Sequence, residues 1–215
     1  MAATPDTEST IELAGAKLKG KRHVCGFFNG PDERYALLMP YVVDGLHQGD
    51  RAFHIIDPGT RDDHLTRLER AGVDVEAVLS SGQLQVLGWE EAYLRGGRFD
   101  QNAMLALIED VLSQGPERGF PLTRLVAHME WGLLPLPGVN DIVEYESRLN
   151  YVLPNYPDPV ICTYDIERFS AGIAFDILRT HPMAIIGGLL QENPFYLPPD
   201  EFLVDLRRRP NTVEA

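Results

Sequence analysis

The segment His128-Met-Glu130-Trp131 carries the side chains best suited to chemistry, because it closes an apolar run that begins at Thr123. Residues two apart on a strand point to the same side of a sheet, so His128 and Glu130 can share a metal ion or a polar ligand. The alternative for His128 is an interior histidine held by hydrogen bonds. A carboxylate is costly to bury without a partner, and Glu130 is therefore expected either to face a cavity or to pair with an arginine.

Two more carboxylates follow apolar runs: Asp57 ends the run from Arg51, and Asp165 ends the run from Pro159. Carboxylates in such positions often cap the following turn or helix. Alternatively, Asp57 and Asp165 converge with Glu130 at one edge of a sheet. Nearby aromatic side chains then either form the apolar walls of a pocket or belong to the core. An apolar pocket with a few fixed polar groups suits a small organic ligand. The candidate ligand-binding residues are Phe27, Phe28, Asn29, Asp57, Trp89, Glu130, Trp131, Tyr164 and Asp165.

The turn at residues 26–34 argues against nucleotide chemistry. A phosphate-binding loop needs GxxxxGK[ST], whose lysine neutralises the phosphates and whose hydroxyl binds magnesium. This turn has Gly26 and Gly30 but no GK[ST], and the chain has no lysine after Lys21. The sequence therefore predicts that the protein does not hydrolyse ATP. Neither a catalytic residue nor a metal-binding residue is assigned, and no cofactor is identified.

Short apolar runs that alternate with longer amphipathic segments must position these residues. The alternation is typical of βα units and predicts an α/β domain with a mostly parallel central sheet. In such a sheet, ligands bind beyond the carboxyl ends of the strands. Strands are expected at 23–28, 51–57, 84–87, 123–131, 159–165 and 183–186, and helices at 32–47, 62–71, 74–81, 101–113, 141–152, 170–180 and from 199 or 200.

The remaining histidines and the cysteines carry weaker signals. His47 and His64 fall on predicted helices and are expected to face solvent. Cys25 and Cys162 lie in strand-like runs without C-x-x-C spacing, so the sequence gives no sign of a disulfide framework or a zinc site. Both are expected to be buried small hydrophobic side chains.

Charge and the chain ends limit the partners and the location. The chain has 215 residues, 19 Lys or Arg and 32 Asp or Glu, with a formal net charge of −13. A surface of this sign repels phosphate backbones and anionic lipid, so direct binding to nucleic acid or to a membrane is not expected. The N-terminal residues lack the pattern of a secretory signal, so a cytoplasmic location is expected. We expect a flexible tail at 1–20, a single domain at 21–206 and a C-terminal tail at 207–215, with the arginines from Arg207 to Arg209 solvated.

Several motifs follow one another in a distinctive order. They are His23-Val-Cys-Gly-Phe-Phe28, Tyr41–Asp50, Glu130-Trp131, Glu144–Asn150, Cys162-Thr-Tyr-Asp165, Leu178–Pro182 and Asn193-Pro-Phe-Tyr196. In this order, over about residues 20–205, the chain resembles the methanogen/methylotroph sensory domain family, which includes the sensory domain of the dichloromethane-responsive regulator.

The resemblance implies a three-layer RecA-like fold related to the circadian-clock ATPases, with the phosphate loop lost. It also implies a non-catalytic sensory role, in which the domain binds a small organic molecule such as a hydrocarbon derivative and signals to a regulator. Family members are often fused to helix-turn-helix or kinase modules, whereas here only a short helix follows the last predicted strand. We therefore expect a separate regulatory partner, either a kinase or a transcription regulator, or a signal passed through a homodimer.

Two other functions stay open at this point. The first is a protein–protein interaction module without a ligand, which an exposed apolar patch would indicate. The second is an acid/base hydrolytic enzyme that uses Glu130, His128 or Asp165.

Overall fold

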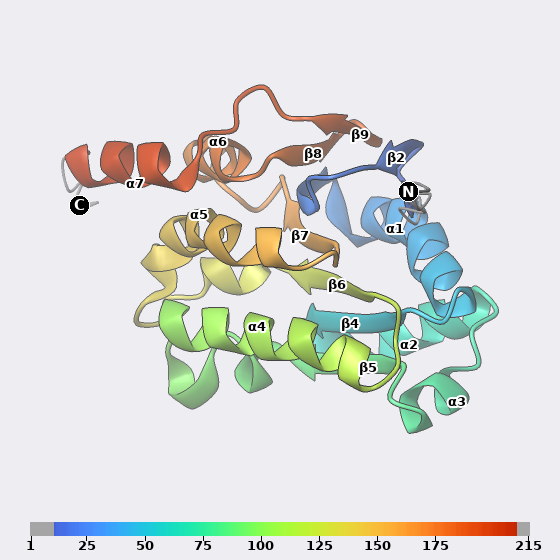
Figure 1. The fold of residues 1–215 in the computed structure, drawn as a ribbon. Coiled ribbons are helices and arrows are strands. Elements are labelled where there is room, and N and C mark those ends of the chain that lie inside the picture. Colours follow the sequence, from blue (N-terminus) through green and yellow to red (C-terminus); the bar gives the residue numbers. More distant parts are fainter. Residues whose placement is uncertain (1–10, 210–215) are drawn as a thin grey trace.

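The fold is a seven-stranded sheet with helices on both faces (Figure 1), as described for residues 11–209 by a computed structural model. The strand order is β5-β4-β6-β7-β3-β8-β9, and every neighbouring pair is parallel except β8 and β9. The predicted α/β class with a mostly parallel sheet is confirmed. The strands are β3 (His23–Phe28), β4 (Arg51–Ile56), β5 (Leu84–Gly88), β6 (Thr123–His128), β7 (Val160–Asp165), β8 (Met183–Ile186) and β9 (Leu189–Glu192).

Helices form the two outer layers. They are α1 (Gly30–His47), α2 (Arg61–Arg70), α3 (Val75–Ser80), α4 (Gln101–Glu117), α5 (Ile142–Val152), α6 (Ala171–Thr180) and α7 (Pro199–Arg208). One apolar core joins the sheet to α1, α2 and α3, and another joins it to α4, α5 and α6. Alternate residues of a strand point to opposite faces, and β7 accordingly sends Ile161 to the first core and Cys162 to the second.

The first described residues form a β-hairpin where we expected a flexible tail. β1 (Ile11–Leu13) pairs antiparallel with β2 (Ala16–Leu18). Ile11, Leu13 and Leu18 are buried in the core beside α1. The backbone N–H of Leu190 on β9 donates to the carbonyl of Ala14 at 3.1 Å, which ties the hairpin to the sheet. The expected tail at 1–20 is therefore wrong for residues 11–18, and residues 1–10 lie outside the described part.

The expected C-terminal tail also begins too early. α7 continues to Arg208, and Arg209 donates to Asp176 on α6 at 2.5 Å and to Asp205 at 3.3 Å. Arg207 and Arg208 are exposed as predicted, but on a helix. The amphipathic spacing of α7 buries Phe202 and Leu203 and so extends the domain beyond residue 206. Residues 210–215 lie outside the described part.

Two strands end earlier than predicted. β4 ends at Ile56, because the carboxylate of Asp57 accepts the N–H of Gly59 and turns the chain. β6 ends at His128, and residues 130–133 form a 3₁₀ turn. Within residues 11–209, none of the helices combines the length and the apolar character needed to cross a lipid bilayer.

A buried arginine ties α1 to the centre of the sheet. Arg124 on β6 is fully buried, and its Nε donates to Asp50 Oδ2 at 2.7 Å while its guanidinium also donates to the carbonyl of Tyr41 at 2.7 Å. Gly45 on α1 leaves space for this guanidinium, because a Cβ at that position would collide with it. A buried charge needs a close partner of opposite sign, and Asp50 supplies it.

The substitution Asp50→Ala leaves the Arg124 charge buried without its closest carboxylate, so we expect the free energy of unfolding to fall by about 3–5 kcal/mol. Asp44→Ala is the matched control. The Asp44 carboxylate lies 3.6 Å from the same guanidinium but is 47% exposed, and we expect a loss below about 1 kcal/mol. Urea denaturation followed by circular dichroism measures both. Equal losses in the two variants would show that the buried Arg124–Asp50 pair stabilises the fold no more than the exposed Asp44 carboxylate does.

Candidate functional site

The carboxyl ends of β3, β4, β6 and β7 meet at one edge of the sheet, because these strands are parallel. Asp57 Oδ1 accepts the N–H of Gly59 at 2.9 Å, and Asp165 Oδ1 accepts the amide two residues later at 3.1 Å. Asn29 donates its backbone N–H and its side-chain amide to Glu33 Oε2 at 2.6 and 2.8 Å. The two aspartates thus cap turns, which is the first of the two alternatives from the sequence.

Glu130 pairs with an arginine. Its Oε1 lies 2.8 Å from the guanidinium of Arg34 on α1, and both side chains are largely buried. The same guanidinium nitrogen lies 3.4 Å from the hydroxyl of Thr163 on β7. Of the two predicted outcomes for Glu130, a cavity or an arginine partner, the structure realises the arginine partner.

The predicted aromatic walls belong to the cores. Trp131 stacks on Tyr93 with ring centroids 4.5 Å apart, and it lies in the same core as Trp89. Phe28 belongs to the core on the opposite face of the sheet, and Phe27 is only partly buried. The nine predicted ligand-binding residues are therefore divided between turn caps, an ion pair and two cores, except for the exposed Asn29, which is bonded to Glu33. Contact between these residues and a ligand stays a prediction.

Three histidines lie together near the same edge, between α1, α2 and the sheet. His54 Nδ1 lies 2.8 Å from His64 Nε2, and His64 Nδ1 lies 2.8 Å from the hydroxyl of Tyr35. The rings of His64 and His128 have centroids 6.2 Å apart. These side chains border a cavity of about 20 Å³, which holds about one water molecule. We call it the histidine cavity; its walls are Arg34, Tyr35, Leu38, Met39, Val42, His54, His64, Leu68, Val126 and His128.

His64 was expected to face solvent, and this expectation is wrong. The side chain is buried on the inner face of α2, one turn before Leu68. Residues four apart on a helix share a face. The spacing to Leu68 is therefore the sequence signal that places His64 inside, whereas His47 is exposed as predicted.

The three histidines of the histidine cavity are neutral at neutral pH, whereas Arg34 in its wall is charged and paired with Glu130. Burial and the nearby Arg34 guanidinium lower the pKa of His64 to about 4. Burial lowers the pKa of His54 and of His128 well below the usual range, and Arg34 adds to the effect on His128. His54 Nε2 is buried without a hydrogen-bond partner. The hydrogen bonds that join Tyr35, His64 and His54 can run in either direction. His54 Nε2 lacks a partner in both cases, as a donor in one direction and as an acceptor in the other.

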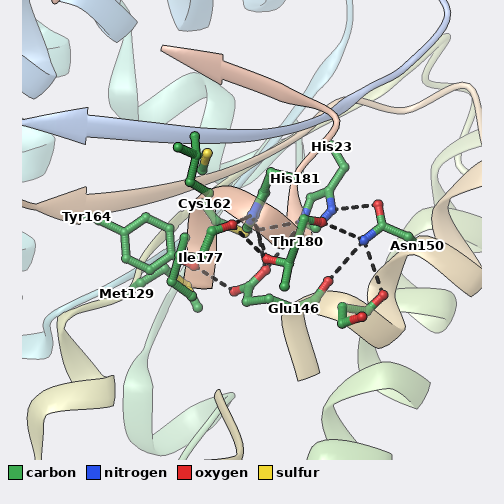
Figure 2. A network of polar contacts seen from close by, with 12 residues as sticks. His23, Met129, Glu146, Asn150, Cys162, Tyr164, Ile177, Thr180 and His181 are labelled. Atoms are coloured by element: carbon green, nitrogen blue, oxygen red, sulfur yellow. Dashed lines mark hydrogen bonds and ion pairs between the residues drawn. The ribbon is translucent and has the colours of Figure 1, made fainter. Parts of the chain in front are cut away.

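Tyr164, one of the predicted site residues, points into a second polar cluster, which Figure 2 shows. Its hydroxyl donates to Glu146 Oε1 at 2.9 Å. The other oxygen, Oε2, lies 3.3 Å from His23 Nε2 and 3.2 Å from His181 Nε2. One donor atom from each of four side chains lies within 4.8 Å of the other three, and such atoms can hold a metal ion. The four side chains are His23, Glu146, Cys162 and His181.

This second cluster is buried on the α4–α6 side of the sheet. Burial and the neighbouring His181 lower the pKa of His23 to about 4. Burial works to raise the pKa of Glu146, but the contacts with His181 and His23 outweigh it and hold the pKa at about 2. The carboxylate is therefore ionised inside the core.

The sequence reasoning did not single out His23, Glu146 or His181 as site residues. One signal was available: Glu146 lies four residues after Ile142 and three before Leu149, on the apolar face of its helix. A glutamate in that position must be buried with partners.

Comparisons with known proteins agree with this fold. The family model of MEDS, the MEthanogen/methylotroph, DcmR Sensory domain, matches residues 22–182. The transcriptional repressor DcmR of Methylorubrum extorquens is 27% identical over 173 residues, which are 79% of this chain. The match covers 62% of the length of that relative.

A likeness to a solved structure supports the RecA-like architecture. A KaiC-like protein of the hyperthermophilic archaeon Pyrococcus horikoshii superposes with a TM-score of 0.54 at 15% identity, covering 76% of this chain and 71% of the other. At this identity the likeness concerns the fold alone, and the RecA-like fold implied by the sequence resemblance is confirmed. With the family model matching residues 22–182, the chain belongs to the MEDS family of sensory domains.

Proposed function

We propose that the chain is a non-catalytic sensory module that binds a small, neutral organic molecule in the histidine cavity and relays the signal to a separate regulatory protein. The observation that carries the proposal is the buried, unpartnered Nε2 of His54 in the wall of a partly apolar cavity. Buried polar atoms are nearly always hydrogen-bonded, so an unpaired one is a place where a ligand gains a hydrogen bond. Membership of a sensory domain family supports the same role.

The walls favour a neutral ligand of few atoms. Leu38, Val42 and Val126 supply apolar surface, whereas the histidines are uncharged and offer one hydrogen bond. The cavity holds about one water molecule and must widen to admit an organic molecule; the unbranched side chain of Met39 is suited to change its rotamer. A short alcohol supplies both the apolar surface and the hydrogen bond.

The state of the nearby carboxylates supports binding without turnover. Glu130 is paired with Arg34, and Asp57 and Asp165 cap turns. A general base must reach the substrate proton with a free carboxylate. The absence of lysine after Lys21 adds to this argument, because neither a Schiff-base lysine nor a phosphate-loop lysine is available from β3 onward.

The two helices that border the cavity provide a route for the signal. Arg67 on α2 donates to Asp32 on α1 at 2.8 Å, and this ion pair joins the two helices at the protein surface. A ligand that moves α2 relative to α1 changes the surface that these helices present. The relative named a transcriptional repressor supports a regulatory partner, and we place the module in the cytoplasm.

A second candidate is an interaction module that works without a ligand. It is favoured by the exposed apolar side chains of Ile186, Leu189, Phe175 and Phe195, near the edge strand β9. The two phenylalanine rings have centroids 6.2 Å apart. Titration of the chain with small-molecule probes separates the two candidates.

The substitution His54→Phe removes the unpaired nitrogen and fills the cavity. We expect saturable histidine side-chain chemical-shift changes when the wild-type chain is titrated with dichloromethane or with methanol, and at least a ~10-fold weaker response in His54→Phe. His47→Phe, at an exposed position on α1, is the matched control and keeps the wild-type response. A wild-type chain that gives no saturable change with either probe refutes the ligand proposal and favours the interaction module.

The free energy of unfolding should fall as the pH is lowered from about 6.5 to about 4. In this range His64 is protonated in the unfolded chain but neutral in the folded chain. The folded-state pKa of His64 is about 4, and the unfolded value is about 6.5. Between these values the unfolded chain binds more protons, so the stabilisation from neutral His64 is complete above pH ~6.5 and lost towards pH ~4. The loss from this side chain is on the order of 3 kcal/mol.

Urea denaturation of the wild type, His64→Gln and the exposed control His47→Gln at several pH values measures this effect. The folded-state environment of His64 includes Arg34, Arg61, Asp63 and the other two cavity histidines. We expect a flatter pH profile in His64→Gln and a wild-type slope in His47→Gln. Parallel profiles for all three chains would mean that His64 keeps its ordinary pKa in the fold.

A further inference from the structure

Four metal-ligating side chains from distant parts of the chain converge in the core. His23 begins β3, Glu146 lies on α5, Cys162 lies on β7 and His181 follows α6. All four are at most 2% exposed, and their donor atoms lie within 4.8 Å of one another (Figure 2). This cluster is separate from the histidine cavity, which lies on the α1–α2 face of the sheet.

The hydrogen bonds of Asn150 fix the protonation of the His23 ring. Its Nδ2 donates to the backbone carbonyls of Glu146, Ser147 and Thr180 at 2.8–3.2 Å. Carbonyls only accept, so this atom is the amide nitrogen and Oδ1 is the acceptor. His23 Nδ1, which lies 3.1 Å from that oxygen, therefore carries a proton and donates it.

The His181 ring is fixed in the same way. Its Nδ1 lies 2.8 Å from the carbonyl oxygen of Ile177, which can only accept. Nδ1 is therefore the N–H of this ring as well. In the neutral form of each histidine, Nε2 then bears a lone pair, and both Nε2 atoms lie on the side of Glu146.

The carboxylate of Glu146 is held so that one oxygen has no donor. Oε1 accepts the hydroxyl of Tyr164, whereas Oε2 has no aligned hydrogen bond although it lies 3.2–3.3 Å from both Nε2 atoms. His181 Nε2 is likewise buried without a hydrogen-bond partner. With both histidines neutral, two nitrogen lone pairs face an anionic oxygen and repel it, and either a proton on one Nε2 or a metal cation among the three atoms removes this repulsion.

Three of the separations among these four atoms lie near the spacing in a tetrahedral metal site, and all four atoms lie within 4.8 Å of one another. Ligand bonds of about 2.0–2.3 Å to zinc place neighbouring ligand atoms roughly 3.3–3.6 Å apart. The observed separations are 3.3 Å from Glu146 Oε2 to His23 Nε2, 3.2 Å to His181 Nε2, and 3.9 Å from Cys162 Sγ to His23 Nε2. Thiolate and imidazole donors in this geometry select zinc over magnesium or calcium.

We propose that His23 Nε2, His181 Nε2, Glu146 Oε2 and Cys162 Sγ bind one zinc-like divalent cation. Asn150, the carbonyl of Ile177 and the hydroxyl of Tyr164 orient the ligands, as outer partners do in metal sites. Cys162 loses its thiol proton to solvent when the ion binds, and the two anionic ligands then balance the charge of the cation. Four protein ligands leave no open position, so the ion ties β3, β7, α5 and the end of α6 together rather than performing catalysis.

A surface cavity of about 290 Å³ lies beside His23. His23 and Asn150 line it together with Lys21, Arg22, Leu153, Tyr156 and Tyr196. Entry of the ion from this cavity requires the side chains around His23, which is 2% exposed, to move.

The first experiment measures metal bound to the full-length chain. Chain treated with a chelator is dialysed, loaded with Zn²⁺ or Co²⁺ and analysed by mass spectrometry of elements and by visible spectroscopy. We expect one ion per chain, with cobalt showing the absorption of a tetrahedral site and a near-ultraviolet thiolate band, and a higher melting temperature with either ion. If the folded chain takes up neither ion and its melting temperature is unchanged, the cluster is held by protons alone and the proposal is wrong.

Cysteine variants assign the sulfur ligand. Cys162→Ser is expected to abolish the thiolate–cobalt band and to weaken metal binding by at least ~100-fold. Cys25→Ser is the matched control, because Cys25 is equally buried, lies opposite Cys162 in the β3–β7 pair and keeps its sulfur on the carbonyl of Met183. Loss of the band in Cys25→Ser but not in Cys162→Ser would overturn the assignment.

The outer partner Tyr164 gives a test in a chain with all four ligands intact. Tyr164→Phe removes only the hydroxyl that holds Glu146 Oε1, and we expect ~10–100-fold weaker zinc binding with the cobalt spectrum retained. Competition with a chromophoric chelator measures the affinity. An unchanged affinity would contradict the proposed role of the Tyr164 hydroxyl in orienting Glu146 as a ligand. None of these results depends on binding in the histidine cavity, so this proposal and the sensory proposal fail separately.

Discussion

The ionised carboxylate of Glu146, enclosed in the core, constrains the half of the fold around β3 and β7. An unpaired charge in this position would cost several kcal/mol, so every neighbouring element contributes a polar atom towards it. Tyr164 from β7, His23 from β3 and His181 after α6 all reach the same carboxylate. The strand order places these elements side by side although the residues lie up to 158 positions apart (181 − 23).

The sheet separates two sites of different character. On the α4–α6 face, the Glu146 cluster is closed by hydrogen bonds that fix each ring and leave the donor atoms facing one another. On the α1–α2 face, the histidine cavity is bordered by helices whose contacts with each other are at the surface. The first arrangement joins β3, β7, α5 and the end of α6 through buried contacts, whereas the second encloses a small cavity between two helices and the sheet.

Loss of the phosphate loop is compatible with keeping the RecA-like frame. The position that a phosphate loop occupies, after the first strand of the sheet, here leads into α1, where Arg34 is neutralised by Glu130. The carboxyl edge still gathers polar groups, as parallel topology requires. These groups satisfy one another, so the edge is closed by an ion pair and turn caps where a nucleotide enzyme would hold phosphate.

The sequence by itself determined the class of the fold and the family. The alternation of apolar runs and amphipathic segments predicted the parallel sheet, and the missing lysine excluded a phosphate loop. Turn caps at Asp57 and Asp165 and an arginine partner for Glu130 were among the alternatives that the sequence offered, because these are local or pairwise demands of a buried charge. Only the tertiary structure decided that Trp131 fills a core and that His23, Glu146, Cys162 and His181 meet. The periodicity of a segment predicts which face of its own helix or strand a side chain occupies. It does not predict which distant element packs against that face, because strand order and packing determine this.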